Sequence, residues 1–379
     1  MGADILFFVE DPGAANYVAQ IPGALADRGW KTVFLASGSA RDYLLERGLR
    51  PGMVERSATA EAILASTRPR VVVVGTAENE DALTLGMISC ARRLGVRSVG
   101  VVDALMNAEY RFRGRSTSPL AYAPDCLFVP DDRVKGAYSR LGYVEDRVIV
   151  CGHPHYDYVR SVAARLTSAD IRRLRRSLVP RAPDDSAVVV FAAEPSTGLR
   201  PGQYRRSSEY TLAGRGDRDG RTEVVLDEFM DAMAGVSPRP YLVLRLHPKN
   251  GCDEFAEHSR RFDQVSSGGS GLELVCAADL VVGMTSMLLL EATLVGRPTL
   301  SIVPRRTETT WLPTIQAGIT PCATDPGEIT RHLAAALKDP GRRDTSAVDR
   351  VLPRDSSRRV IEQIECLLGA ERRQPQGEQ

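Results

Sequence analysis

Two carboxylates follow the first apolar run of the sequence, where they can support acid–base chemistry. Glu10 and Asp11 come directly after residues 4–9, and a Pro-Gly turn leads on through Gly13 to Asn16. Either carboxylate can act as a general base on an acceptor hydroxyl if burial raises its pKa. The main chain around Gly13 can face a polar or anionic ligand. The alternative is that Asp11 only caps a helix.

A second polar segment follows the apolar run 97–102. Asp103 and Asn107 come first, and Glu109 and Arg111 follow them. A charged segment directly after a buried strand points towards a ligand site, because ligands bind beyond the carboxyl ends of parallel strands. Asp103 and Glu109 are therefore further candidates for the base. An ordinary surface loop remains an equally open interpretation.

Three potential cations lie at the end of the apolar run 241–246. Arg245, His247 and Lys249 occupy alternate positions, so an extended chain would place them on one side. Such an array of charge-assisted donors suits a diphosphate and requires no metal ion. The alternative is a solvated basic strand end.

Hydroxyl groups follow the apolar run 280–283. Thr285 and Ser286 stand where a helix begins, and Glu291 lies within that helix among apolar residues. Hydroxyls and main-chain N–H groups at a helix N-terminus form a phosphate site. A carboxylate inside an apolar helix needs a polar partner, and ribose hydroxyls are suitable candidates. The pattern predicts a nucleotide-binding segment.

Metal ligands are not indicated with the same strength. His153 and His155 stand two residues apart in Cys-Gly-His-Pro-His, but no third ligand has a convincing spacing. A turn after a strand is the better interpretation. No Asp-x-Asp motif is convincing either, because Asp131 and Asp132 resemble a helix cap. We therefore expect neither a metal site nor a cofactor.

The polar stretch 200–221 is too long for a simple turn. Long loops in compact domains are usually functional or disordered. A lid ordered by substrate and a disordered loop are both open interpretations.

Short apolar runs alternate with amphipathic stretches along the chain, which is the pattern of a parallel, doubly wound α/β sheet. The pattern occurs twice. In the first half it predicts strands at 4–9, 32–35, 71–74, 97–102, 126–129 and 147–151, and helices at 15–28, 40–48, 60–66, 80–94 and 131–141. In the second half it predicts strands at 187–192, 241–246, 280–283 and 298–303, and helices at 223–234, 252–263, 286–295, 326–338 and 356–368.

The weakening of this pattern at 156–186, which is rich first in Arg and then in Pro, predicts a helix and an interdomain linker. The expected plan is an acceptor domain at 1–155, a linker at 156–186, a donor domain at 187–353, a crossover helix at 354–369 that packs back on the first domain, and a disordered tail at 370–379. We expect the ligand site in a cleft between the domains.

Composition excludes several classes of protein. The 379 residues contain 49 Lys+Arg and 48 Asp+Glu, and this balance argues against bulk nucleic-acid binding. No apolar run reaches the ~18 residues of a membrane helix, and the N-terminus lacks the basic region of a signal peptide. The seven scattered Cys predict a reduced, cytoplasmic protein. A homodimer is left open.

The whole chain resembles the GT-B superfamily of nucleotide-sugar glycosyltransferases and non-hydrolysing UDP-GlcNAc 2-epimerases. Thr285-Ser286, Glu291 and Gly296-Arg297-Pro298 are similar to its nucleotide-binding segment. The run 245–248 resembles the His-Pro motif of capsule and teichoic-acid transferases, and residues 10–16 resemble bacterial polysaccharide-biosynthesis proteins. This resemblance implies two Rossmann-like domains and a nucleotide-diphosphate sugar as co-substrate.

The resemblance also implies roles for the candidate residues. The donor nucleotide would bind Arg245, His247, Lys249, Thr285, Ser286 and Glu291, and the acceptor would bind Gly13, Asn16, Asp103 and Asn107. Asp11 or Glu10 would deprotonate a small-molecule or glycan acceptor, while His247 stabilises the departing diphosphate. The expected activity is metal-independent glycosyl transfer in polysaccharide or secondary-metabolite biosynthesis.

Three alternatives remain. The first is a nucleotide-sugar 2-epimerase or hydrolase, although such epimerases carry a glycine pair and extra acidic residues where this chain has Thr285, Ser286 and Met287. The second is a CDP-glycerol-type glycerophosphotransferase. The third is a catalytically dead GT-B protein that only binds.

Overall fold

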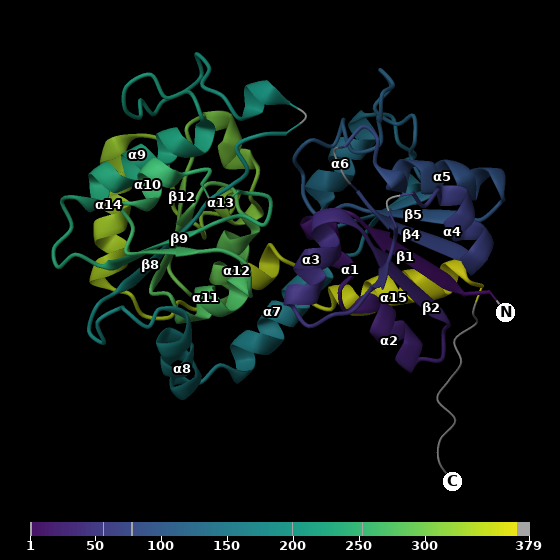
Figure 1. Cartoon of the computed structure of the whole chain (residues 1–379), viewed down its shortest axis with the longest axis horizontal. Coiled ribbons are helices and arrows are strands. Elements are labelled where there is room, and N and C mark those ends of the chain that lie inside the picture. Colours follow the sequence, from purple (N-terminus) through teal and green to yellow (C-terminus); the bar gives the residue numbers. More distant parts are fainter. Residues whose placement is uncertain (1, 56, 77–78, 199, 252, 370–379) are drawn as a thin grey trace, which may run out of the picture. The chain divides into compact units, whose positions relative to one another are not determined.

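The computed structural model describes residues 2–55, 57–76, 79–198, 200–251 and 253–369. The chain divides into two compact units (Figure 1), one formed by the described residues of Met1–Asp157 and Pro353–Gln379 and the other by Tyr158–Leu352. The predicted tail at 370–379 lies outside the described residues. No helix within the described ranges has the length and apolar character needed to cross a membrane.

The first unit is built on a parallel sheet. Its described strands follow the order β3-β2-β1-β4-β5-β6-β7. They are β1 (Ile5–Val9), β2 (Thr32–Ala36), β3 (Gly52–Met53), β4 (Val71–Gly75), β5 (Arg97–Val101), β6 (Cys126–Val129) and β7 (Val148–Val150). Chain order reverses between β1 and β4, the switch point at which ligands bind in such sheets.

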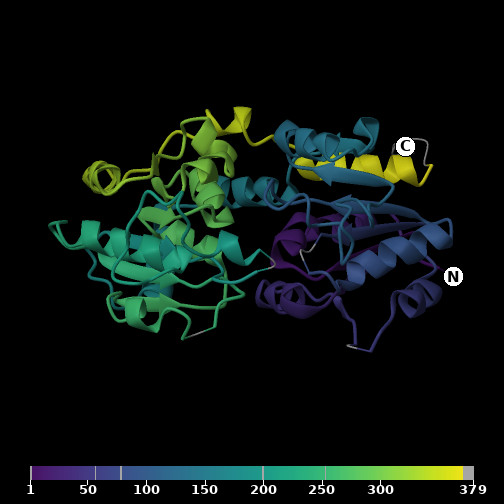
Figure 2. The ribbon, with the colours of Figure 1, turned by 90° about the horizontal axis from the view of Figure 1, so that it is seen from above.

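Helices cover both faces of this sheet, as Figures 1 and 2 show. They are α1 (Pro12–Val18), α2 (Ile21–Asp27), α3 (Gly38–Glu46), α4 (Ala60–Thr67), α5 (Leu83–Arg93), α6 (Asp132–Arg140) and α15 (Ser356–Leu367). Alternate residues of β1 enter different cores: Phe7 packs with α1, α2 and α15, whereas Phe8 packs with α4, α5 and α6. Burial on both faces explains the continuous apolar character of the strand.

The helix α15, the last one among the described residues, belongs to the first unit. Val360, Ile361 and Ile364 are buried in the core that contains Phe7. Glu365 accepts hydrogen bonds from Arg28 at 3.0 Å and from Trp30 at 3.1 Å, next to α2. An amphipathic helix far along the chain thus completes the core of the N-terminal fold.

The second unit repeats the same plan. Its described strands are ordered β10-β9-β8-β11-β12-β13 and all pair in parallel. They are β8 (Val188–Ala192), β9 (Tyr241–Arg245), β10 (Gln264–Ser266), β11 (Leu280–Gly283), β12 (Thr299–Ile302) and β13 (Cys322–Ala323). The switch point lies between β8 and β11.

Helices also surround the second sheet. They are α8 (Ser168–Leu178), α9 (Arg221–Met233), α10 (Ala256–Ser259), α11 (Gly271–Ala277), α12 (Met287–Val295), α13 (Pro313–Gln316) and α14 (Pro326–Lys338). Short 3-10 helices occur at η1 (Glu145–Arg147), η2 (Pro201–Gln203), η3 (Arg306–Thr310) and η4 (Val348–Arg350). The helix α7 (Pro154–Arg165) contains the boundary between the two units.

The structure differs from the sequence-based elements mainly at edges and in short segments. The two- and three-residue strands β3, β10 and β13 were not predicted, because so short a run carries little periodic signal. The helix predicted at 15–28 is interrupted near Gln20 and becomes α1 and α2. Within 156–186 a helix followed by a linker was predicted; the helix is α7, and a second helix, α8, capped by Thr167 with Asp170, was not predicted.

Candidate functional site

The switch point of the second sheet brings together a carboxylate and a hydroxyl residue. Glu194 follows β8, and Thr285 follows β11. The main-chain N–H of Thr285 donates to Oε1 of Glu194, and the Thr285 hydroxyl lies 3.1 and 3.2 Å from the two carboxylate oxygens. Glu194 is 9% exposed and Thr285 is 4% exposed. The loop that was predicted to bind phosphate therefore already donates hydrogen bonds to anionic oxygen.

Two buried arginines extend this contact. Arg221, the first residue of α9, donates from Nη1 to Glu194 at 2.6 Å and from Nε to Glu308 at 2.9 Å. Arg305 follows β12, and its Nε lies 3.4 Å from Glu308. Burial opposes the charge of Arg221, but the carboxylates of Glu308 and Glu194 outweigh it and raise the pKa of Arg221. We call Glu194, Arg221, Arg305 and Glu308 the buried ion network.

The segment 200–220 is attached to this network. Arg305 donates from Nη2 to the carbonyl of Gln203 at 2.6 Å and to the hydroxyl of Tyr210 at 3.2 Å. Tyr210 and Arg305 also form an antiparallel bridge, and the N–H of Thr211 donates to the carbonyl of Pro304 at 2.8 Å. Hydrogen bonding thus ties the described part of this segment to the end of β12, an arrangement that the sequence interpretation did not anticipate.

The three predicted donor cations do not share one side of a strand. Extended structure ends at Arg245, which is buried and donates to Ser266 at 3.0 Å and to the carbonyls of Gly268 and Gly269. Arg245 therefore holds the turn before α11. The chain then turns, and the main-chain N–H of Asn250 donates to the carbonyl of His247 at 2.8 Å. The expected alternation was wrong because this turn replaces the extended chain.

His247 and Lys249 remain near the carboxyl edge of the sheet. The N–H of Lys249 donates to Nδ1 of His247 at 3.1 Å, which assigns the proton of a neutral imidazole to Nε2. The Nδ2 amide of Asn250 lies 3.4 Å from the carbonyl of Glu194, so the His247 turn adjoins the switch-point loop. His247 is partly exposed, and Lys249 is exposed.

Ser286 and Glu291 occupy different environments on α12. Ser286 caps the helix by accepting the N–H of Leu288 at 3.3 Å, and its side chain is partly exposed. Glu291 is 4% exposed among the buried residues of the helix. The roles of both residues towards a nucleotide stay predictions.

In the first unit, Glu10 contacts the start of α5. Its carboxylate accepts the N–H of Leu83 at 3.3 Å and the N–H of Thr84 at 3.0 Å. A carboxylate at this position satisfies otherwise unpaired helix donors and complements the helix dipole. This contact gives Glu10 a structural task, and its predicted role as a base stays a prediction.

Asp11 and Gly13 begin α1. Asp11 is the N-cap residue and accepts the N–H of Gly13 at 3.1 Å, in agreement with the capping alternative. A Cβ atom at Gly13 would lie 2.0 Å from Oδ2 of Asp103, so any larger residue there would require the Asp103 side chain to shift. The polar segments that follow the first and fourth predicted strands are thus in direct proximity at the carboxyl edge of the first sheet.

Asp103 is held by a buried arginine. Arg111 lies 2.8 Å from the Asp103 carboxylate and also donates to the Thr76 hydroxyl at 2.8 Å. Burial favours the neutral acid, but the charge of Arg111, aided by His153, outweighs it and lowers the pKa of Asp103. Asp103 is therefore ionised at neutral pH, which suits the stabilisation of positive charge, whereas its lowered pKa makes it a weak base.

The two asparagines predicted to bind an acceptor differ in setting. Asn16 is 8% exposed, and its side-chain oxygen accepts from the Tyr43 hydroxyl at 2.8 Å and from Arg47. Asn107 is partly exposed in a turn with a positive φ of 58°. Asn16 is thus engaged by α3, whereas Asn107 lies in the loop between Asp103 and Arg111.

His153 is the residue of the first unit whose importance the sequence did not indicate. It is fully buried, and its ring stacks on Tyr156 at 4.7 Å and lies 4.8 Å from the ring of Tyr17. Burial lowers the pKa of His153 to about 3, so its imidazole is neutral at physiological pH. Its electrostatic interaction with Asp103 places it beside the carboxyl edge of the sheet.

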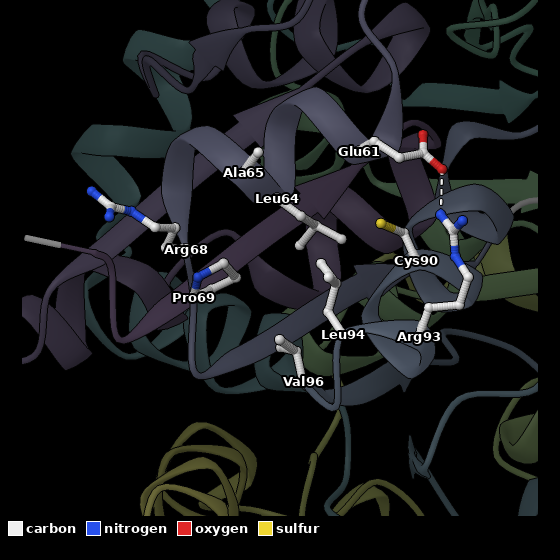
Figure 3. A pocket seen from close by; sticks show the side chains of 9 residues that line it. All are labelled: Glu61, Leu64, Ala65, Arg68, Pro69, Cys90, Arg93, Leu94 and Val96. Atoms are coloured by element: carbon white, nitrogen blue, oxygen red, sulfur yellow. Dashed lines mark hydrogen bonds and ion pairs between the residues drawn. The ribbon is translucent and has the colours of Figure 1, made fainter.

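An apolar pocket lies elsewhere on the first unit (Figure 3). It has a volume of about 670 Å³ and lies between α4 and α5, where Pro69 precedes β4 and Val96 precedes β5. Glu61 and Arg93 form an ion pair at 2.5 Å on its rim. This pocket adjoins the amino ends of the strands, so its position and apolar lining do not match the polar residues after the strands.

Metal ligands do not gather in the described residues: no group of three or more His, Cys, Asp or Glu there has the geometry to hold an ion. In particular, His153 and His155 have ring centroids 6.2 Å apart and belong to the aromatic cluster around Tyr156.

Glu194, Arg221, Arg305 and Glu308 were missed as site residues in the sequence. Glu194 carries the signal that drew attention to Glu10, a glutamate directly after a buried strand. Arg221 and Glu308 carry no such signal, because their pairing joins positions 87 residues apart.

Comparison by sequence identifies no relative: no family model matches this chain, and no curated protein matches it. Comparison of folds does. The chain is similar to a UDP-GlcNAc 2-epimerase from Neisseria meningitidis bound to UDP-GlcNAc, with a TM-score of 0.65 and 14% identity over 95% of this chain and 99% of the other.

Two further solved structures are similar over nearly the whole length. A glycosyltransferase from Rickettsia africae has a TM-score of 0.62 at 10% identity, covering 98% of this chain and 100% of the other. Anabaena Alr3699/HepE in complex with UDP-glucose has a TM-score of 0.65 at 13% identity, covering 96% and 99%. The chain therefore has the two-domain α/β fold of the GT-B nucleotide-sugar enzymes.

Proposed function

We propose that this protein is an enzyme that binds a nucleoside-diphosphate sugar at the carboxyl edge of the second sheet and acts on the sugar without a metal ion. The observation that carries the proposal is the switch-point loop. Thr285 anchors the loop by donating its N–H and its hydroxyl to Glu194, and the partly exposed Ser286 follows at the start of α12, where it can meet a ligand. A loop of this kind at a helix N-terminus suits the oxygens of a diphosphate.

We favour chemistry on the donor sugar itself, epimerisation or hydrolysis, over transfer to an acceptor. Several similar structures are UDP-GlcNAc 2-epimerases, and two of them hold UDP-GlcNAc. In addition, Glu10 and Asp11, the bases proposed for an acceptor hydroxyl, accept main-chain N–H groups of α5 and α1. Asp103 is ionised beside Arg111, but this pairing lowers its pKa and makes it a weaker base, so it suits the stabilisation of positive charge.

Glycosyl transfer is the second candidate. The similarity to the Rickettsia africae glycosyltransferase supports it. Transfer differs from the favoured chemistry in one measurable respect, because it requires an acceptor before the sugar leaves the nucleotide. The two candidates share the nucleotide site and differ in what the first unit does.

The first experiment is thermal stabilisation by UDP, dTDP, GDP, CDP and ADP, with and without magnesium. A ligand that binds the native state raises the melting temperature by mass action. We expect a shift with one nucleotide, with UDP tested first because the similar structures contain UDP-GlcNAc and UDP-glucose. No shift with any of the five would contradict the proposal.

The second experiment incubates the protein with UDP-GlcNAc and UDP-glucose in the absence of an acceptor and follows the sugar by NMR. A new epimer, or free sugar with UDP, supports the favoured chemistry. Recovery of unchanged substrate, followed by release of UDP when a panel of hydroxyl acceptors is added, would instead support transfer.

A further inference from the structure

Glu194 connects loops that follow three strands of the second sheet. Its carboxylate accepts from Thr285 after β11 and from Arg221 at the start of α9. Its carbonyl lies 3.4 Å from the amide of Asn250 after β9 and 3.4 Å from the hydroxyl of Thr222. The candidate nucleotide residues Thr285 and His247 thus lie on turns that both contact one buried glutamate.

The contact with Glu194 determines which hydrogen-bond donors of this loop can face a ligand. A threonine has one main-chain N–H and one hydroxyl proton, and both face the carboxylate. Thr285 is also 4% exposed, whereas Ser286 is partly exposed. A diphosphate at this loop would therefore meet Ser286, with Thr285 acting from behind to hold the loop in place.

The same carboxylate reaches the segment 200–220 through two arginines. The guanidinium of Arg221 bridges Glu194 and Glu308. The main-chain N–H of Arg221 donates to the carbonyl of Tyr204 at 2.9 Å. Arg305 approaches Glu308 and binds the carbonyl of Gln203. A continuous chain of hydrogen bonds and ion pairs therefore runs from the Thr285 loop to the segment.

The network is balanced in charge and shielded from water. Two arginines face two glutamates, and Arg221 is 3% exposed while Glu308 is fully buried. Removing one partner from such a set leaves a buried charge unpaired. The loss of folding free energy is then larger than the stabilisation that an exposed ion pair provides. The network therefore has a single favoured arrangement that fixes the Thr285 loop and the segment together.

We propose that Glu194 is a positioning residue that couples the nucleotide-binding loop 284–286 to the segment 200–220, so that each is ordered only when the other is. Only the part of this inference that concerns nucleotide binding rests on the proposed function. The segment is rich in arginine, and Arg205 and Arg206 are exposed. Cleavage by trypsin at these arginines therefore reports directly on whether the segment is held.

The test compares Glu194→Gln with Glu209→Gln, an exposed glutamate of the same segment. For Glu194→Gln we expect trypsin to cleave the segment at least tenfold faster without nucleotide, and UDP to bind about tenfold more weakly. Glu209→Gln should match the wild-type protein in both measurements. In the wild-type protein, UDP should slow the cleavage.

A double-mutant cycle separates positioning from a general loss of stability. Thr285→Val removes the hydroxyl but keeps the N–H, and Thr285→Ser keeps both donors. We expect Thr285→Val and Glu194→Gln to be less than additive in their effect on cleavage rate, because they remove one interaction, and we expect Thr285→Ser to restore protection. Melting temperatures of all variants show whether the whole unit has unfolded.

Two results would overturn the inference. Tighter nucleotide binding by Glu194→Gln would mean that the carboxylate competes with phosphate instead of holding the loop. Unchanged cleavage of the segment in a folded Glu194→Gln protein would mean that no coupling exists. If the wild-type protein binds no nucleotide, the proposed function fails, but the cleavage measurements still decide whether Glu194 holds the segment.

Discussion

Both hydrogen-bond donors of Thr285 face the carboxylate of Glu194, across the switch point between β8 and β11. This relationship gives the two hydroxyl residues of the predicted phosphate loop different roles. The buried Thr285 is engaged by protein, and the partly exposed Ser286 is the hydroxyl that faces outward.

Ser286→Ala should weaken UDP binding by about tenfold or more, because a hydrogen bond to a charged group contributes about 1.5–3 kcal/mol. The measurement is calorimetric titration of the folded variant. Ser286 also caps α12, so the matched control is Ser270→Ala, which removes the N-cap of α11. Equal weakening by both variants would refute a direct role for Ser286.

His247→Ala should weaken donor binding and slow turnover. The Nδ1 atom of His247 accepts the N–H of Lys249, so in the neutral imidazole Nε2 carries the proton, and we expect Nε2 to donate to negative charge that develops on a diphosphate. Initial-rate kinetics with the substrate identified by NMR provide the measurement. Unchanged kcat and KM would remove His247 from the site.

Asp11→Asn separates capping from catalysis. Asparagine caps helices as well as aspartate does, so we expect the free energy of unfolding to change by less than about 0.5 kcal/mol. If Asp11 is the base of a transferase, activity should nevertheless be abolished while nucleotide binding persists. Asp27→Asn, at an exposed position, is the control. Retained activity would leave Asp11 as the cap of α1 only.

Arg111→Met should destabilise the first unit by about 3–5 kcal/mol, because it leaves the carboxylate of Asp103 buried without its cation. Urea unfolding measures the loss. Arg115→Met removes an exposed ion pair with Asp81 and should cost at most about 1 kcal/mol. Similar costs for the two variants would show that Asp103 does not depend on Arg111.

The stability of the first unit should fall as the pH is lowered from 6.5 towards 3. The pKa of His153 is about 3 in the folded protein and near 6.5 when unfolded, so only the unfolded chain takes up the proton in this window. The contribution present above pH 6.5 and lost on acidification is on the order of 5 kcal/mol.

His153→Phe removes this titration while keeping an aromatic ring between Tyr17 and Tyr156. We expect a flatter stability profile between pH 6.5 and 3, measured by urea unfolding at each pH. His332→Phe on α14 serves as the control and should follow the wild-type profile. An unchanged slope in His153→Phe would contradict the assignment.

The sequence alone determined the repeated α/β plan and the position of most elements. Continuous apolar runs such as 71–74 and 188–191 identify buried parallel strands, because a strand covered on both faces needs apolar residues throughout. Polar residues after these runs, such as Asp103 and Thr285, identify the carboxyl edges, because connections in parallel sheets bring ligand-binding loops to that edge.

Only the tertiary structure decided which of these side chains meet. The ion pairs of Arg221 with Glu194 and Glu308 join residues 27 and 87 positions apart, and Arg111 reaches Thr76 across 35. No local period encodes such pairs, since the burial that makes them necessary arises only when strands and loops pack. Local sequence therefore predicts the strands, whereas the partners of the buried charges are determined by how the strands and loops pack.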